Sequence, residues 1–526
     1  MGANLTERDA SRLRLWHVGL LAFVLALALG LVRPGASWGA SAYDPAADPY
    51  SMQNTTAGDG AQDWWNAGYT GAGVDVALID TGVAPVPALS GKGKIVNGPD
   101  LSFESQSPSL QYLDTNGHGT FMAGIIGGND GQPDGYSGVA PDSRILSVKV
   151  GAANGAVDVS QVIAAVDWIV QHRHDNGMNI RVISLSYGTD SLQPFVIDPL
   201  AYAVERAWKA GIVVVTAAGN TGADSGLADP AYDPWLIAVG AADTMGTPSM
   251  SDDQPASFSA GASRCGFFDC RAPDLLAPGA HLQGLRDPGS YVDQNNPGAA
   301  LGDKYFRGSG TSEAAAYVTG AVALLLQEYP QLSPDGVKQM LKESADSLPG
   351  YSTRWQGAGE LDLNALLSDS PPRRARQFHL SSIGTGSLEA SRGSSHLSLN
   401  GVVLQGDQDI FGQPFRPVRM AVLEALGSSW SGGTWNGSQW TGSSWSGSSW
   451  SGSSWSGSSW SGSSWSGLDW GDLSWSDNSW GGSSWSGSSW SGSSWSGSSW
   501  SGSSWSGSSW SGSNWASDQW LGATWG

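Results

Sequence analysis

The chain has 526 residues, of which 26 are lysine or arginine and 47 are aspartate or glutamate, so its formal net charge is −21. This length exceeds one ordinary domain, and two or three regions are expected. The acidic balance, with no basic patch among aromatic residues, excludes nucleic acid as an expected partner and favours solubility outside the cell.

The first 42 residues predict an export signal. An apolar run over residues 15–32 follows three arginines and precedes Ala40-Ser41-Ala42. This order is typical of a signal peptide, here residues 1–42, with an A-x-A cleavage site. The alternative is an uncleaved membrane anchor, because eighteen apolar residues are barely enough to span a bilayer. Either way we expect a secreted or surface-attached protein, with a short N-terminal segment over residues 43–58.

Strand-like and helix-like segments alternate from residue 59 to about 367. Short runs rich in valine and isoleucine are typical of strands buried on both faces of a sheet. Such runs cover residues 74–80, 144–150, 181–187, 212–218 and 236–241, and helical patterns cover residues 119–127, 159–173, 199–210 and 311–328. The alternation predicts an α/β domain with a parallel sheet and helices on both faces, which binds ligands beyond the carboxyl ends of its strands.

Three segments in fixed order supply an acid, a base and a nucleophile. Asp80 ends a strand in Asp80-Thr81-Gly82, His118 stands between two glycines, and Ser312 opens a helix in Gly310-Thr311-Ser312. A serine hydroxyl needs an imidazole to take its proton, and that imidazole needs a carboxylate to fix its tautomer. The order Asp, His, Ser differs from that of chymotrypsin-like enzymes and of α/β-hydrolases. We expect Asp80, His118 and Ser312 to be catalytic.

Together with Ala217-Ala218-Gly219-Asn220, these segments resemble the subtilisin-like serine peptidases, or subtilases, over roughly residues 59–367. The resemblance implies a subtilisin-like fold and an endopeptidase that cleaves proteins or peptides through an acyl-enzyme. It implies that Asn220 and the backbone N–H of Ser312 form the oxyanion hole. The chemistry would need no cofactor. Structural calcium is common in the family, but no ligand set is secure in this sequence, so calcium stays open.

The resemblance also predicts two walls of a substrate-binding pocket. Ser186, Tyr187 and Gly188 would form one wall, and Ala217, Ala218 and Gly219 the other. An extended peptide would pair with the first wall as an antiparallel strand and gain main-chain hydrogen bonds. The alternative for both segments is simple core packing, which their inner-facing residues must provide in any case.

Two features depart from the family. Glu313 follows the nucleophile where methionine or serine is common. If its carboxylate is partly exposed on the leaving-group side, we expect a preference for Lys or Arg just after the scissile bond. The alternative is a pair with Arg307 inside the protein. Subtilases also commonly carry a folded inhibitory prodomain, for which only residues 43–58 are available here, so either the enzyme folds without one or a distal segment substitutes.

The chain has two cysteines, Cys265 and Cys270, with four residues between them. In an exported chain a disulfide that closes this loop is the leading interpretation, and a pair of free thiols is the alternative. A metal site would need further cysteine or histidine ligands nearby, and none is visible.

The remaining residues differ in composition from the α/β domain. Residues 368–426 begin with a Pro- and Arg-rich linker, and the alternating runs 396–399 and 401–404 indicate a linker or small β-rich module. Residues 427–526 form a low-complexity repeat tail with a tryptophan at every fifth position, twenty of the chain's 28. Period five fits neither a helix nor a strand, so no single element aligns the tryptophans.

The repeat tail leaves two interpretations open. It is either a ligand-binding or self-associating region, for example one that contacts wall polysaccharide, or a disordered spacer. The first interpretation gives a rival function, in which the chain is a surface adhesion protein and the peptidase domain only processes it.

Overall fold

The computed structural model describes residues 43–107, 109–132, 135–262, 271–399, 402–431, 433–441, 444–446, 514–516 and 519–521. The expected signal peptide and both cysteines lie outside these residues, so those predictions stay untested. The chain divides into two units, Met1–Asp44 and Pro45–Gly526, and the helices and strands belong to the second. Within the described ranges, no helix combines the length and apolarity that a bilayer crossing requires.

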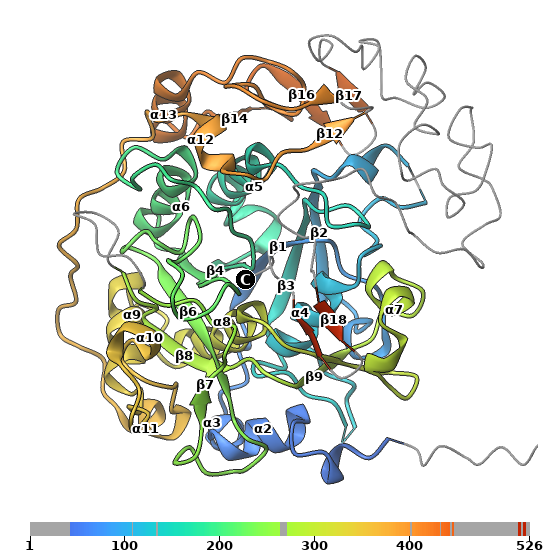
Figure 1. Cartoon of the computed structure of the whole chain (residues 1–526), viewed down its shortest axis with the longest axis vertical. Coiled ribbons are helices and arrows are strands. Elements are labelled where there is room, and N and C mark those ends of the chain that lie inside the picture. Colours follow the sequence, from blue (N-terminus) through green and yellow to red (C-terminus); the bar gives the residue numbers. More distant parts are fainter. Residues whose placement is uncertain are drawn as a thin grey trace, which may run out of the picture. The chain divides into compact units, whose positions relative to one another are not determined.

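An eight-stranded sheet lies at the centre of the α/β domain (Figure 1). Its strands are β1 (Asp75–Asp80), β2 (Ile95–Asp100), β3 (Arg144–Lys149), β4 (Ile180–Leu185), β5 (Val213–Ala217), β6 (Ile237–Asp243), β7 (Gln254–Pro255) and β8 (Leu275–Pro278). The order is β2-β3-β1-β4-β5-β6-β7, and β8 also pairs with β6. Only the β6–β7 pair is antiparallel; the other seven strands run parallel.

Strand β1 lies where the strand order reverses. It pairs with β3 on one side and with β4 on the other, so that Ile79 stands opposite both Val148 and Leu185. In open parallel sheets the crevice beyond the carboxyl ends at this point is where ligands bind. Asp80, the last residue of β1, is thereby placed at the edge of that crevice.

Helices cover both faces of the sheet, as predicted (Figure 1). On one face, α5 (Val159–His172) packs against α6 (Pro199–Lys209), and on the other α4 (His118–Gly127) packs against α8 (Thr311–Glu328). All but the last two residues of α8 are buried, because this helix crosses the middle of the domain. Such burial explains its apolar and small residues on every side. The predicted α/β fold is confirmed.

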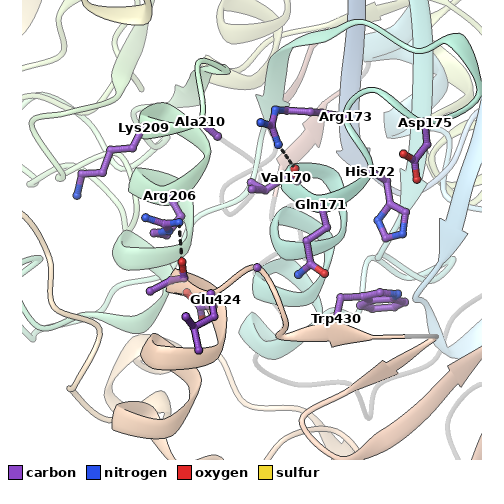
Figure 2. A pocket seen from close by; sticks show the side chains of 13 residues that line it. Val170, Gln171, His172, Arg173, Asp175, Arg206, Lys209, Ala210, Glu424 and Trp430 are labelled. Carbon is purple, nitrogen blue, oxygen red and sulfur yellow. Dashed lines mark hydrogen bonds between the residues drawn. The ribbon is translucent and has the colours of Figure 1, made fainter.

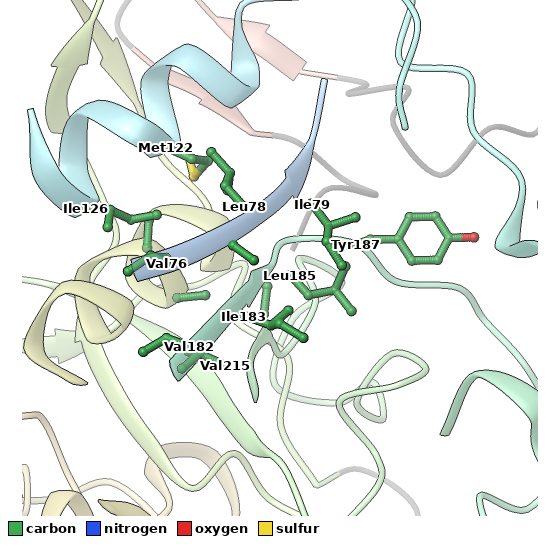
Figure 3. Packing of buried hydrophobic residues seen from close by; sticks show 14 of the residues in the cluster. Val76, Leu78, Ile79, Met122, Ile126, Val182, Ile183, Leu185, Tyr187 and Val215 are labelled. Atoms are coloured by element: carbon green, nitrogen blue, oxygen red, sulfur yellow. The ribbon is translucent and has the colours of Figure 1, made fainter. Parts of the chain in front are cut away.

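The main core lies between β1, its neighbouring strands and the helices. In Figure 3, Leu78 lies beside Met122 of α4, whereas the next residue, Ile79, lies on the side of Tyr187. Successive side chains of a strand point to opposite faces of the sheet. Both faces of β1 are therefore packed, which explains why this strand reads as a continuous apolar run.

The other elements of the domain surround this sheet. The helices are α2 (Met52–Gly58), α3 (Ala61–Asn66), α7 (Tyr291–Asn295), α9 (Pro334–Glu343), α10 (Thr353–Gln356) and α11 (Leu363–Ser368). Short 3-10 turns cover Pro45–Ala47, Pro87–Leu89, Phe103–Gln106, Asp175–Gly177 and Pro297–Ala299. A small antiparallel sheet has the order β10 (Ala300–Leu301), β11 (Tyr305–Gly308), β9 (Leu282–Leu285). The N-terminal segment is tied to this sheet, since Arg307 pairs with Asp48.

Residues 388–426 fold onto the α/β domain. They contain α12 (Leu388–Arg392), α13 (Pro417–Ala425) and a hairpin of β12 (Ser398–Leu399) with β13 (Val402–Val403). The hairpin lies where the alternating runs predicted strands, but the two helices were not predicted. Arg392 is fully buried and its Nε donates to Asp158 at 2.6 Å, and Asp158 caps the start of α5. Arg206 of α6 donates to the carbonyl oxygen of Ala425 at 3.3 Å (Figure 2).

The first pentads of the repeat form a four-stranded antiparallel sheet. Its strands are β14 (Trp430–Ser431), β15 (Thr434–Trp435), β16 (Ser438–Thr441) and β17 (Ser444–Ser446), and a further pair is β18 (Asn514–Ala516) with β19 (Gln519–Leu521). Asn436 and Gly437 both have positive φ, as a two-residue hairpin turn requires. The short strands bury Trp430, Trp435 and Trp440 together, which no single element could do.

Candidate active site

Asp80 and His118 form a buried pair beyond the end of β1. The Nδ1 of His118 lies 2.9 Å from Oδ1 and 3.1 Å from Oδ2 of Asp80. The N–H of Thr81 also donates to Asp80 at 2.7 Å. Burial raises the pKa of Asp80, and the charge and hydrogen bond of His118 oppose that shift. The sequence predicted this pair, and the carboxylate holds the imidazole by its Nδ1 side.

A second carboxylate, Asp114, shapes the turn that carries His118. Asp114 accepts the N–H of Gly117 at 2.8 Å and both the N–H and the hydroxyl of Thr120 at 2.7 Å. It also accepts the hydroxyl of Thr81 at 2.8 Å. Sequence reasoning missed Asp114. The available signal is an aspartate four residues before the histidine in a turn that precedes a helix, where such side chains commonly bind backbone N–H groups.

Gly119 permits the close approach between the two halves of the pair. Its N–H donates to the hydroxyl of Thr81 at 2.9 Å. A Cβ at this position would lie 2.1 Å from the carbonyl oxygen of Gly82 and 2.9 Å from Oδ1 of Asp80. The glycine after His118 is therefore a packing requirement of the site and not a feature of a flexible loop.

Ser312 lies in the first turn of α8, which packs against α4. Its Oγ is buried and forms no hydrogen bond with any described residue. Its backbone N–H belongs to the first turn, where helical N–H groups lack intrahelical partners. Burial raises the pKa of Glu313, the next residue, and the Asp80 carboxylate adds to the rise, so the start of α8 lies close to the Asp80–His118 pair.

Asn220 follows β5 and is fixed to the same helix start. Its Oδ1 accepts the N–H of Thr311 at 2.9 Å and the hydroxyl of Thr311 at 3.1 Å. Because the N–H of Thr311 requires an acceptor, the amide oxygen faces the helix. The Nδ2 then faces away from Thr311, toward Gly310, where a Cβ would lie 3.3 Å from it. This orientation suits a donor to an oxygen held beside Ser312.

The two predicted pocket walls extend from neighbouring strands. Ser186, Tyr187 and Gly188 follow β4, and Ala217, Ala218 and Gly219 end or follow β5. The Tyr187 side chain is buried in the core, so only its backbone can meet a substrate. Ala228, which sequence reasoning missed, lies between the walls: a Cβ on Gly188 would meet the Ala228 Cβ at 2.6 Å, and one on Gly219 would meet it at 3.6 Å.

Comparison with known proteins decides the family. A model described as the subtilase family matches residues 71–359, more than half of the chain. The chain belongs to the subtilase family. Its enzyme class is that of the subtilisin-like serine endopeptidases, which are hydrolases.

Individual relatives match more than half of this subtilase. Serine protease AprX of Bacillus subtilis (strain 168) is 39% identical over 298 residues, which cover 56% of this chain and 66% of AprX. Subtilisin Savinase of Lederbergia lenta is 33% identical over 300 residues, which cover 57% of this chain and 93% of Savinase. The crystal structure of a cold adapted subtilisin-like serine proteinase, at 30% identity, aligns with a TM-score of 0.41 over 56% of this chain and 88% of that one.

Glu313 of this subtilase is fully buried, which contradicts the expected partial exposure. The alternative pair with Arg307 is also wrong, because Arg307 pairs with Asp48 and donates to the carbonyl oxygen of His281. Burial raises the pKa of Glu313 to about 8, and the Asp80 carboxylate adds to the rise. Glu313 is therefore mostly neutral at pH 7, and the expected preference for Lys or Arg after the scissile bond loses its physical basis.

Structural calcium stays a prediction for this subtilase. Among the residues that the structure describes, no group of three or more His, Cys, Asp or Glu side chains is arranged to hold a metal ion. Calcium binding is dominated by carboxylate and carbonyl oxygens, so side-chain clusters are only part of a candidate site. Cys265 and Cys270 lie outside the described residues, and their disulfide likewise stays a prediction.

Proposed function

We propose that this subtilase is a secreted endopeptidase that hydrolyses peptide bonds through an acyl-enzyme formed on Ser312. The observation that carries the proposal is the buried hydrogen bond between Asp80 and Nδ1 of His118, beside the helix start that holds Ser312. Since Nδ1 binds Asp80, Nε2 is the nitrogen that receives the serine proton.

The chemistry follows from these positions. Ser312 Oγ attacks the carbonyl carbon as its proton passes to His118, and the carbonyl electron pair moves onto the oxygen. The Nδ2 of Asn220 and the N–H of Ser312 stabilise this oxyanion. The C–N bond then breaks, and the amine leaves with the proton from His118. Water, activated by the same imidazole, hydrolyses the acyl-enzyme, while Asp80 orients the ring and stabilises its charged form.

Substrate binding is assigned to the two walls that follow β4 and β5. An extended peptide would add as an antiparallel strand beside residues 186–188, so that affinity comes from main-chain hydrogen bonds. The side chain before the scissile bond would enter between this wall and residues 217–219, where Ala228 limits the depth of the pocket. Small wall residues favour an apolar side chain there.

Secretion is supported by the sequence of residues 1–42. The wall-polysaccharide contact expected of the tail receives no support from its first pentads, because Trp430, Trp435 and Trp440 are buried inside the protein. The rival function as an adhesion protein therefore rests on the other tryptophans of the tail. We favour the peptidase function for this reason.

Labelling with a serine-directed fluorophosphonate tests the proposal. Mass spectrometry of the labelled protein from the culture medium should place the label on Ser312, in a chain that begins after residue 42. Ser312→Ala should take no label and lose peptidase activity with an unchanged far-UV circular dichroism spectrum, because the change removes one oxygen. Ser90→Ala, at an exposed position, is the matched control and should behave as the parent.

Two outcomes would contradict the proposal. A Ser312→Ala protein that kept activity within tenfold of the parent would show that the nucleophile is wrong. Labelled protein found only in membranes, with residues 1–42 still attached, would support the uncleaved anchor and overturn secretion.

A further inference from the structure

Glu313 is a buried acid that has no charged partner among the residues that the structure describes. Its side chain is fully buried at the start of α8, and neither carboxyl oxygen has a hydrogen-bond partner on another described residue. Its own backbone N–H is the group that favours the ionised form. Buried carboxylates are almost always paired, because leaving a charge unpaired in the interior is costly. The side chain next to the nucleophile is therefore a neutral acid.

The carboxyl group lies in the same small space as the oxyanion donor. A Cβ on Gly310 would lie 2.6 Å from Oε2 of Glu313 and 3.3 Å from Nδ2 of Asn220. Both side chains thus flank one point in front of the first turn of α8. Because Gly310 has no side chain, nothing on that residue separates them. An oxygen bound by Nδ2 of Asn220 would lie close to the carboxyl group of Glu313.

Few titratable groups in the described part of the chain face this end of α8. The elements packed against it bring Asp80 from β1 and His118 from α4, and these two form a pair with each other. Asp59 and Glu360 face Tyr317, more than one turn further along the helix. Burial, the larger cause, and Asp80 together raise the pKa of Glu313 to about 8. A protonated carboxyl group is an O–H donor, whereas an ionised one only accepts hydrogen bonds.

We propose that Glu313 is a further catalytic residue, which in its neutral form donates a hydrogen bond to the oxyanion alongside Asn220 and the N–H of Ser312. The proton stays on Glu313 throughout: the carbonyl electron pair moves onto the oxygen, the O–H donates to it, and the interaction weakens when the C–N bond breaks. Ionised Glu313 would instead place a negative charge beside the developing oxyanion. Hydrolysis therefore stops when Glu313 loses its proton. This inference rests on the proposed function.

Two substitutions separate the donor role from simple packing. Glu313→Gln keeps the shape and an N–H donor but cannot ionise, and Glu313→Leu keeps the approximate volume but has no donor. The measurement is kcat and KM from pH 6 to pH 10 on a peptide p-nitroanilide whose charge is constant over that range. Asp409→Asn is the matched control. Asp409 is another buried acid, in residues 388–426, and burial raises its pKa to about 7.

We expect the parent and Asp409→Asn to lose kcat above about pH 8. Glu313→Gln should lose this alkaline decline while keeping kcat at pH 7 within a few-fold of the parent. Glu313→Leu should lower kcat at pH 7 by about 10²-fold with little change in KM, as removal of an oxyanion donor does. A Gln variant with the parent's alkaline decline would overturn the proposal, and so would a Leu variant with the parent's kcat.

Fluorophosphonate labelling distinguishes failure of this inference from failure of the proposed function. If Ser312 of the parent takes no label, the proposed function fails. If Ser312 is labelled but the pH profiles of the parent and Glu313→Gln coincide, only the role of Glu313 fails. Should the Leu variant not fold, the Gln profile decides the matter alone, because an amide replaces the acid without a change of shape.

Discussion

His118 is held in place by contacts that leave no room for a side chain at the next position. Asp80 binds its ring, Asp114 binds the turn before its helix, and Thr81 links the two carboxylates. Hydrogen bonds to a carboxylate are shorter and stronger than those between neutral groups. This network therefore fixes both the position and the orientation of the imidazole ring. The glycine at position 119 closes the network, since its N–H binds Thr81.

Gly119→Ala should therefore damage catalysis directly. The new Cβ would lie 2.1 Å from the carbonyl oxygen of Gly82, so the start of α4 must move away from Asp80. A displacement of about 1 Å in a catalytic group costs on the order of 10²-fold in rate, and we expect a loss of kcat of at least that size. Steady-state kinetics on a peptide amide would measure it.

Gly91→Ala is the control for this prediction. Gly91 is exposed, and its added Cβ would make only an ordinary contact, at 3.8 Å, with Lys94. The control should keep the parent's kcat. If Gly119→Ala also kept it, the packing requirement inferred around His118 would be wrong.

At the scale of elements, the segment of residues 388–426 is joined to the α/β domain by a buried charge pair. Arg392 of α12 binds Asp158, whose other oxygen accepts the N–H of Ser160 at 2.9 Å and so caps α5. Arg392 also donates to the carbonyl oxygen of Gly406 at 2.7 Å. One guanidinium thus connects a helix cap of the domain with two parts of the segment, and the stability of each depends on the other.

Arg392→Ala should lower the free energy of unfolding by about 3–5 kcal/mol, because it leaves Asp158 buried without its cation. Urea unfolding of the Ser312→Ala protein, which cannot digest itself, would measure the change. Arg374→Ala, in the exposed linker, should shift the value by no more than about 0.5 kcal/mol. An equally small effect of Arg392→Ala would show that residues 388–426 fold independently of the domain.

The sequence predicted the longer strands that are rich in valine and isoleucine, and it missed strands that are short or of mixed composition. The Val- and Ile-rich runs gave β1, β3, β4, β5 and β6 to within a few residues, because both faces of these strands are buried. Strand β2 was missed, since Asn97-Gly98-Pro99 has the composition of a turn and the strand lies at the sheet edge. Residues 388–426 dock partly through Arg392, whose burial no local pattern reveals.

The site divides in the same way. A recognisable sequence motif surrounds each of Asp80, His118, Ser312 and Asn220. The structure brings these residues to one end of the sheet. No such motif surrounds Asp114 or Ala228, because their importance comes from the groups that they contact. The position of Glu313 was noticed but its environment was not, since a charged residue beside a glycine-rich turn is usually exposed.

At the scale of the whole molecule, this acidic chain buries several carboxyl groups without enough cations to pair with them. These groups therefore stay protonated at pH values where exposed carboxyl groups are ionised. Burial raises the pKa to about 6 in Asp253, to about 7 in Asp59, Asp167 and Asp409, and to about 8 in Asp233 and Glu313. In the unfolded chain the same groups ionise near their ordinary values of about 4. Between pH 5 and pH 7 the folded protein thus binds more protons than the unfolded chain.

This difference fixes the sign of the pH dependence of stability. Stability rises with pH where the unfolded state binds more protons, and here the folded state does, so the free energy of unfolding should fall from pH 5 to pH 7. The stabilising effect of these buried carboxyl groups is fully present below their pKa in the unfolded chain. It is lost as pH rises through their pKa in the folded protein. Lys338 opposes the trend near and above pH 7, because burial lowers its pKa to about 7 and the folded protein releases this proton where the unfolded chain keeps it.

Asp409→Asn tests the argument at a single group. Because the amide cannot release a proton, this variant should reduce the slope of unfolding free energy against pH by up to about 1.4 kcal/mol per pH unit, the value for one proton. Urea titrations of the Ser312→Ala protein at pH 5, 6 and 7, with and without the second substitution, would give both slopes. Asp63→Asn, at an exposed position, should leave the slope unchanged. Unfolding free energy that was constant or rose between pH 5 and pH 7 would mean that these carboxyl groups are ionised in the folded protein, and that cations or water reach them there.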